Sequence, residues 1–133
     1  MALAGEILTS DTLALRITPG KGRGVFAARD IPAREAFVVN PVLVLDEADT
    51  QAVEATSLGF YVFAWPFGPD GARLAESPYV AVAFGLISLV NDAPPETANA
   101  SWECHAEAMV IVGYALRDIA AGEEIQWSYG WGG

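Results

Sequence analysis

Two neighbouring side chains, Asn91 and Asp92, stand where a buried segment of the chain would meet a polar turn. The apolar run from Phe84 to Val90 ends at these residues and then breaks at Ala93-Pro94-Pro95. An amide in such a place commonly contacts a ligand. The alternative for Asn91 is a buried amide that only caps its own turn.

A second motif, at the end of the chain, carries Tyr129. Ile125, Trp127 and Tyr129 alternate with polar residues, so on a strand their side chains share one face. That face could line a narrow aromatic slot. Alternating aromatic residues also form ordinary core, and this motif alone favours core.

The third motif is the glycine-rich stretch from Thr18 to Gly24. Its glycines predict a loop in which positive φ and close approach of the backbone to a ligand are both possible. It lacks the spacing of a phosphate-binding loop, and strand-like residues follow it where such a loop would need a helix. Lys21 and Arg23 lie within this stretch. Because most of the basic residues lie in the first quarter of the chain, we expect a bound carboxylate or phosphate there.

Composition limits the classes of protein that the chain could be. With 133 residues it fits a single domain, and the formal charge of −10 argues against nucleic acid and favours a basic protein or peptide partner. No apolar run reaches the roughly 20 residues that span a bilayer, and the start lacks the features of a secretory signal, so we expect no membrane contact and a cytoplasmic location. Cys104 is the only cysteine, and it is adjacent to His105 rather than spaced for chelation. We therefore expect neither a disulfide nor a metal site.

The elements that must position these motifs are mainly short strands. Leu13 to Ile17, Val25 to Ala28, Ala36 to Val39, Val42 to Leu45, Phe60 to Trp65 and Tyr79 to Ala83 read as strands, and a hairpin follows with arms at Ser101 to His105 and Met109 to Ala115. One short helix is expected within Asp46 to Ser57. The sequence Arg29 to Glu35 is echoed by Arg117 to Glu123, which predicts one kind of turn used twice. The fold class is therefore mainly β with little helix.

In their order along the chain, the motifs resemble the SET-domain protein lysine methyltransferases. The matching pieces are Gly22 to Ala27 with Asp30-Ile31, the aromatic segment with Tyr61, the segment ending at Asn91, Asn99-Ala100, and Ala115 to Ile125 with Tyr129. The likeness runs from about residue 13 to 129, as in a minimal stand-alone SET domain spanning 1–133. It implies several small twisted sheets with a C-terminal pseudoknot, in which the asparagine and tyrosine motifs are neighbours.

The resemblance also implies roles for individual residues. S-adenosyl-L-methionine would be bound by Lys21, Gly22, Arg23, Gly24, Asn91, Asp92 and Tyr129. Tyr129 would be catalytic, with Tyr61 as a second tyrosine of the lysine channel, and Trp127 and Trp131 would complete that channel. The expected activity is S-adenosylmethionine-dependent protein-lysine N-methylation of a basic, possibly histone-like, protein or peptide.

Two departures from the family pattern leave alternatives open. Asp92 stands where the family has histidine, and an ionised carboxylate cannot donate a hydrogen bond. An impaired SET-like domain that only binds cofactor or peptide is therefore the alternative function. No post-SET segment follows Trp131 in this sequence, so the lid must come from Trp131 or from a second copy in a homodimer, or be missing.

Overall fold

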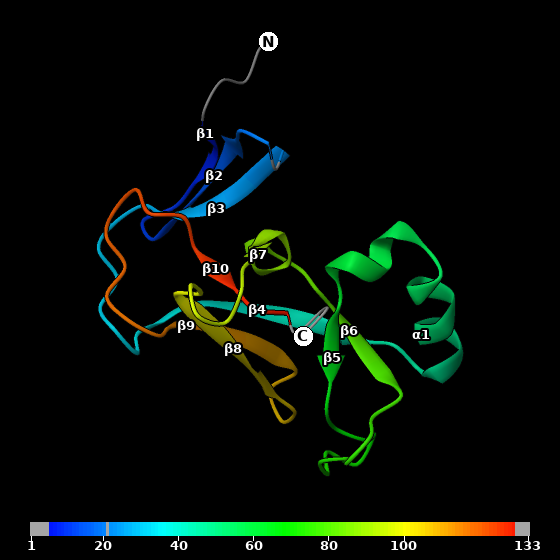
Figure 1. Ribbon diagram of the computed structural model, residues 1–133. Helices are drawn as coiled ribbons and strands as arrows, with labels where there is room; N and C mark the ends of the chain where they lie inside the picture. The colour runs from blue at the N-terminus through cyan, green and yellow to red at the C-terminus, as the bar shows by residue number, and fades with distance from the viewer. Residues whose placement is uncertain (1–5, 21, 130–133) are drawn as a thin grey trace. The chain divides into compact units, whose positions relative to one another are not determined.

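The computed structural model describes residues 6–20 and 22–129, and these divide into two compact units. Of the described residues, the first unit takes in 6–20, 22–38, Leu89–Trp102 and 113–129, and the second takes in Val39–Ser88 and Glu103–Val112. Both are built largely of short strands, which confirms the mainly β fold class (Figure 1). Lys21 and Trp131 lie outside the described residues, so their expected roles stay predictions.

In the first unit, β1 (Glu6–Thr9), β2 (Leu13–Thr18) and β3 (Gly22–Ala27) form an antiparallel sheet in that order (Figure 1). Thr18 pairs with Gly22. The predicted loop over Gly22, Arg23 and Gly24 is therefore wrong, because these three residues begin β3. The turn before them includes Gly20, whose φ of 80° suits glycine.

Two very short strands bring the asparagine and tyrosine motifs together in this unit. β7 (Asn91–Asp92) and β10 (Gln126–Trp127) pair in parallel, with Gln126 opposite Asn91 and Trp127 opposite Asp92 (Figure 1). The Ala93 amide donates to the Trp127 carbonyl at 3.0 Å and continues this pairing. The expected proximity of the two motifs is confirmed.

The second unit holds the helices. These are α1 (Glu47–Glu54), the 3₁₀ turn η1 (Ser57–Tyr61) and most of a second 3₁₀ turn, η2 (Leu86–Leu89). The unit also holds β5 (Phe63–Trp65) and β6 (Tyr79–Ala83), which pair in antiparallel fashion. The predicted helix and the strand at Tyr79–Ala83 are thus confirmed. The predicted strand from Phe60 is wrong at its start, because the Thr56 side chain accepts from the Leu58 amide at 3.3 Å and caps a 3₁₀ turn there.

Three further strands complete the sheet that contains β5 and β6. They are β4 (Ala36–Val44), β8 (Ala100–His105) and β9 (Val110–Ala115), and the sheet order is β5-β6-β4-β9-β8. The hairpin predicted for β8 and β9 is confirmed. β4, however, is continuous where two strands separated at Asn40-Pro41 were predicted. Proline is tolerated because only its carbonyl is used: it accepts from the Phe84 amide at 3.0 Å.

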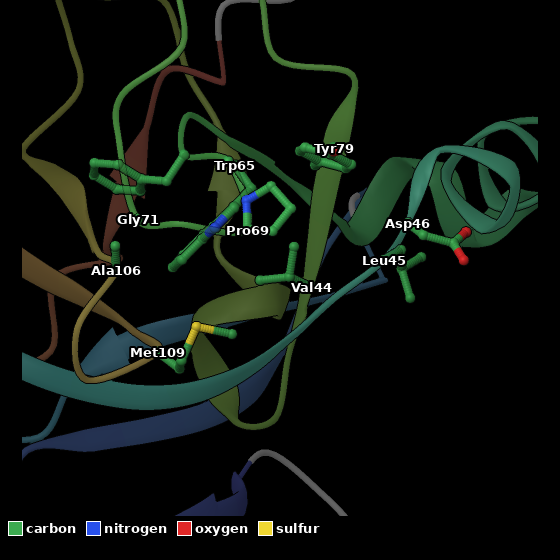
Figure 2. Close-up of a pocket in the computed structure, with 11 residues that line it drawn as sticks. Val44, Leu45, Asp46, Trp65, Pro69, Gly71, Tyr79, Ala106 and Met109 are labelled. Carbon is green, nitrogen blue, oxygen red and sulfur yellow. The ribbon is translucent and has the colours of Figure 1, made fainter.

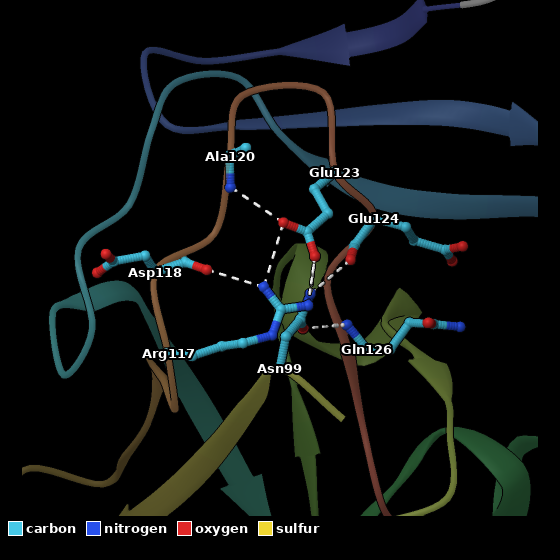
Figure 3. Close-up of polar contacts among 7 residues, drawn as sticks. All are labelled: Asn99, Arg117, Asp118, Ala120, Glu123, Glu124 and Gln126. Carbon is cyan, nitrogen blue, oxygen red and sulfur yellow. Dashed lines mark hydrogen bonds and ion pairs between the residues drawn. The ribbon is translucent and has the colours of Figure 1, made fainter. Parts of the chain in front are cut away.

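The repeated sequence forms two turns that bind each other within the first unit. The Ile31 and Ile119 amides each donate to the other's carbonyl at 2.8 Å. An aspartate of each turn also accepts a hydrogen bond from the other turn. Asp118 accepts from the Ala33 amide, and Asp30 accepts from the Ala121 amide, both at 2.8 Å. Within each turn an arginine pairs with a glutamate. Arg29 pairs with Glu35 in the first turn, and Arg117 pairs with Glu123 in the second (Figure 3). The two turns that the sequence predicts to be alike therefore also contact each other.

Candidate active site

Gly24, Asn91 and Glu124 meet at one point in the first unit. The Asn91 side-chain amide donates to the Arg23 carbonyl at 2.9 Å and to Glu124 Oε2 at 2.8 Å. A Cβ at Gly24 would lie 2.5 Å from Glu124 Oε2 and 2.9 Å from Asn91 Nδ2, closer than real Cβ atoms come. Thr18 Oγ1 would lie 2.8 Å away. Gly24 is therefore a place of close approach, as expected, but its near neighbours here are polar side chains of the chain itself.

The turn that precedes β10 is held by Asn99, which is 3% exposed. Its amide donates to the Glu124 carbonyl at 2.8 Å, and its Oδ1 accepts from the Gln126 amide at 2.9 Å (Figure 3). Glu123, beside it, is paired with Arg117 and accepts from the Ala120 amide at 3.0 Å (Figure 3). The hydrogen bond from Arg117 is the largest influence on the Glu123 carboxyl and lowers its pKa to about 2.

Tyr129 is half-buried and is held from both ends by the Val90–Asp92 segment. Its hydroxyl donates to the Val90 carbonyl at 2.7 Å, and its backbone amide donates to Asp92 Oδ1 at 2.9 Å. Burial raises the pKa of the Tyr129 phenol to about 12; hydrogen bonding with Trp127 opposes this rise, and the Asp92 charge adds to it. The phenol therefore stays protonated across the physiological range.

Tyr129 also belongs to an aromatic cluster with Trp127 and Trp102. The ring of Trp102 lies 5.3 Å from that of Trp127 and 5.6 Å from that of Tyr129, measured between centroids, and Trp127 and Tyr129 meet edge to face at 6.2 Å. Trp127 is fully buried, as the packing interpretation expects, and its place in a lysine channel stays a prediction. Gly113 leaves room for Trp127 and for Val38, because a Cβ there would lie 3.2 Å from Trp127 Cζ3 and 2.7 Å from Val38 Cγ1.

The sequence reasoning brought together some of these residues and missed others. Asn91, Asp92, Gly24 and Tyr129 were predicted and do converge. Trp102 and Glu124 were not singled out as site residues. The only signal for either was its position: Trp102 lies on a predicted strand, and Glu124 lies three residues before Trp127.

Tyr61 belongs to the second unit, where it ends η1 with 46% of its surface exposed. It was expected on a strand, which is wrong, and its role as a channel tyrosine stays a prediction. A cavity of about 330 Å³ also lies in this unit (Figure 2). It is lined by Val44, Leu45, Asp46, Trp65, Phe67, Gly68, Pro69, Gly71, Tyr79, Ala106 and Met109. The guanidinium carbon of Arg73 lies over the Phe67 ring, 5.0 Å from its centroid. Within residues 6–20 and 22–129, none of the predicted site residues lines this cavity.

In residues 6–20 and 22–129, no three His, Cys, Asp or Glu side chains gather where a metal ion could be held. Over the same ranges, no helix combines the length and the apolar character that crossing a membrane requires.

Known proteins match this chain both in sequence and in structure. A family model described as the SET domain matches residues 22–130. A histone-lysine N-methyltransferase of Schizosaccharomyces pombe, specific for H3 lysine-37, is 35% identical over 120 residues, which are 89% of this chain and 73% of that protein. These matches confirm the expected enzyme class, a protein-lysine N-methyltransferase.

Solved structures share the fold at low sequence identity. A histone methyltransferase candidate of Plasmodium falciparum has a TM-score of 0.65 at 18% identity, with 92% of this chain and 96% of that one covered. Polycomb Repressive Complex 2 of Chaetomium thermophilum, bound to the inhibitor GSK126, has a TM-score of 0.64 at 22% identity, covering 96% of this chain and 16% of that one. With the family model covering most of its length, the chain belongs to the SET domain family.

Proposed function

We propose that this protein uses S-adenosyl-L-methionine to methylate a lysine side chain of a basic, histone-like protein or peptide. The observation that carries the proposal is the convergence of three motifs far apart in sequence. Gly24, Asn91 and Tyr129 lie in one unit. Asn91 donates to the Arg23 carbonyl, next to Gly24, and Asp92 accepts from the Tyr129 amide. Gly24 leaves space beside β3, Asn91 offers an amide, and Tyr129 offers a phenol to a bound cofactor and substrate.

The residues present fit the cofactor's charges. S-adenosylmethionine supplies a methyl group on a sulfonium and also carries an ammonium and a carboxylate. The Glu124 carboxylate and the Asn91 amide beside Gly24 suit the ammonium group, and Arg23, exposed on the same strand, suits the carboxylate. The aromatic faces of Trp102 and Tyr129 favour a neighbouring cation.

The direction of the Tyr129 hydrogen bond defines what the phenol can do. Its single proton is directed to the Val90 carbonyl at 2.7 Å, so toward a substrate amine or a polarised methyl group the oxygen acts as an acceptor. As an acceptor, the Tyr129 oxygen can orient the attacking nitrogen, and it does not act as a general acid. The transfer moves positive charge from sulfur to nitrogen, so its needs are alignment, exclusion of water and a neutral amine.

The charge of the protein supports the substrate class. With seventeen acidic residues against seven basic ones, it attracts lysine-rich segments and repels phosphate backbones. The name of the Schizosaccharomyces pombe relative points the same way, because it specifies a lysine of histone H3.

Incubation with labelled S-adenosylmethionine and a panel of basic proteins tests the proposal. We expect the label to be recovered as methylated lysine after complete hydrolysis of the substrate. A Tyr129→Phe variant should have a turnover lower by at least roughly a hundredfold. Absence of transfer, together with no heat of binding for S-adenosylhomocysteine at millimolar concentration, would overturn it. Cofactor binding without transfer would favour the binding-only alternative.

We further propose that two copies associate. Large apolar side chains are exposed in the second unit, among them Phe60 at 68%, Phe84 at 58% and Leu43 at 54%. Exposed apolar groups of this size are typical of association surfaces. Light scattering at working concentration tests the proposal, and a monomeric mass contradicts it without bearing on methyl transfer.

A further inference from the structure

We propose that Asp92 is a positioning residue for methyl transfer: its carboxylate holds the backbone amide of Tyr129 and thereby sets where the phenol hydroxyl lies. This inference deepens the proposed function and rests on it for the role of the phenol. It also gives a role to Asp92, the residue on which the binding-only alternative is based.

The pairing of β7 with β10 explains why a side chain is needed at this point. The parallel ladder joins Asn91 to Gln126 and Asp92 to Trp127, and its last backbone bond runs from the Ala93 amide to the Trp127 carbonyl. Tyr129 lies two residues after Trp127, beyond the end of β10, so its backbone is not part of this ladder. Its amide donates instead to Asp92 Oδ1 at 2.9 Å, so the carboxylate adds one bond where the ladder ends.

The second attachment of Tyr129 comes from the same short segment. Its hydroxyl donates to the carbonyl of Val90, two residues before Asp92, at 2.7 Å. One bond fixes the backbone of the tyrosine and the other fixes the tip of its ring, and both acceptors belong to Val90–Asp92. The Trp127 and Trp102 rings pack beside the phenol and limit its rotation. If the Asp92 bond is lost, the ring keeps its neighbours but its backbone is no longer fixed.

An ionised aspartate suits this task chemically. The Tyr129 amide is a donor and needs an acceptor, which a carboxylate supplies and an ammonium or a guanidinium cannot. Asp92 is exposed, so its charge does not carry the cost of burial, while a bond to an ionised group is stronger than one between neutral groups. Asparagine keeps an acceptor oxygen at the same position, and alanine removes it.

Hydrogen exchange of the Tyr129 amide, followed by NMR on the ¹⁵N-labelled full chain, measures this bond without any need for activity. We expect a protected amide in the wild type. In Asp92→Ala its protection should fall by about tenfold or more, whereas Asp92→Asn should keep most of it. Glu96→Ala is the matched control, because Glu96 is an exposed acid of the same loop.

Steady-state kinetics then tie the bond to the reaction. Asp92→Ala should lower kcat roughly 10- to 100-fold with little change in the dissociation constant of S-adenosylhomocysteine, and Asp92→Asn should restore much of that loss. Glu96→Ala should match the wild type.

Two results would overturn the inference. One is a Tyr129 amide that exchanges equally fast in the wild type and in Asp92→Ala. The other is a kinetic loss in Asp92→Ala that appears wholly in cofactor affinity and is not rescued by asparagine. A wild type without turnover but with the expected exchange pattern would contradict the proposed function alone, since the placement of Tyr129 would still stand.

Discussion

Gly24 has a hydrogen for a side chain because three polar groups occupy the space that a methyl group would take. Glu124 Oε2, Thr18 Oγ1 and Asn91 Nδ2 all lie within 3 Å of an ideal Cβ position. Its φ is not in the left-handed region, so conformational freedom is not the reason for glycine at this position. What a glycine provides here is room for the polar cluster beside the backbone of β3.

Gly24→Ala should therefore disrupt the site more than the fold. We expect a loss of about 1–3 kcal/mol of stability and a dissociation constant for S-adenosylhomocysteine raised by at least roughly tenfold, because the Asn91 amide must move. Calorimetry and denaturant unfolding measure both. Gly20→Ala is the control: it has no atom within 4 Å of a Cβ but a φ of 80°, so it should lower stability and leave cofactor affinity unchanged. Equal affinities for the Gly24→Ala variant and the wild type would contradict this account.

The raised pKa of Tyr129 predicts where alkaline conditions begin to destabilise the protein. The unfolded phenol ionises near its usual value of 10.0 and the folded one near 12, so the folded state binds more protons between these values. The phenol's contribution to the free energy of unfolding is complete below pH 10 and is lost as the pH rises toward 12. The free energy of unfolding, measured with urea across this range, should fall more steeply with pH for the wild type than for Tyr129→Phe. Parallel curves would contradict the raised pKa of Tyr129.

At the scale of elements, the two related turns link the start of the chain to the segment that carries the site. The bonds that Asp30 and Asp118 each accept from the other turn fix the turn before β10. Glu123 and Asn99 extend this support to Glu124 and Gln126 (Figure 3). The turn repeat was visible in the sequence. That each copy completes the other was not, because the bonding partners lie 85 and 91 residues apart.

Acid should loosen this arrangement through Glu123. Its folded pKa of about 2 lies below the usual value of 4.5 for a glutamate, so its contribution to stability is present above pH 4.5 and is lost as the pH falls toward 2. Glu123→Gln should flatten the fall of unfolding free energy over that window. Glu35→Gln, which removes the equivalent ion pair of the other turn, is the comparison, and an equal or larger flattening there would show that Glu123 is not the dominant acid group.

At the scale of the whole molecule, the sequence could predict which elements exist and which motifs matter. β6 and the β8–β9 hairpin follow from local pattern, and the meeting of Asn91 with Tyr129 follows from the family order of the motifs. The contact of Gly24 with Glu124 and the bond from Tyr129 to Asp92 could not be predicted. Both depend on side chains brought together by long-range packing, for which neighbouring residues in the sequence carry no signal.

The net charge of −10 is a property of the whole molecule, and it predicts that substrate capture weakens with salt. A lysine-rich peptide should have a KM that rises several-fold between low salt and about 0.5 M, because mobile ions screen attraction between exposed charges. The dissociation constant of S-adenosylhomocysteine should change far less, since that ligand carries no net charge and its contacts are local. Initial rates and calorimetry over one salt series make the comparison. A KM independent of salt would mean that the acidic surface serves solubility and that substrate recognition lies in contacts close to Tyr129.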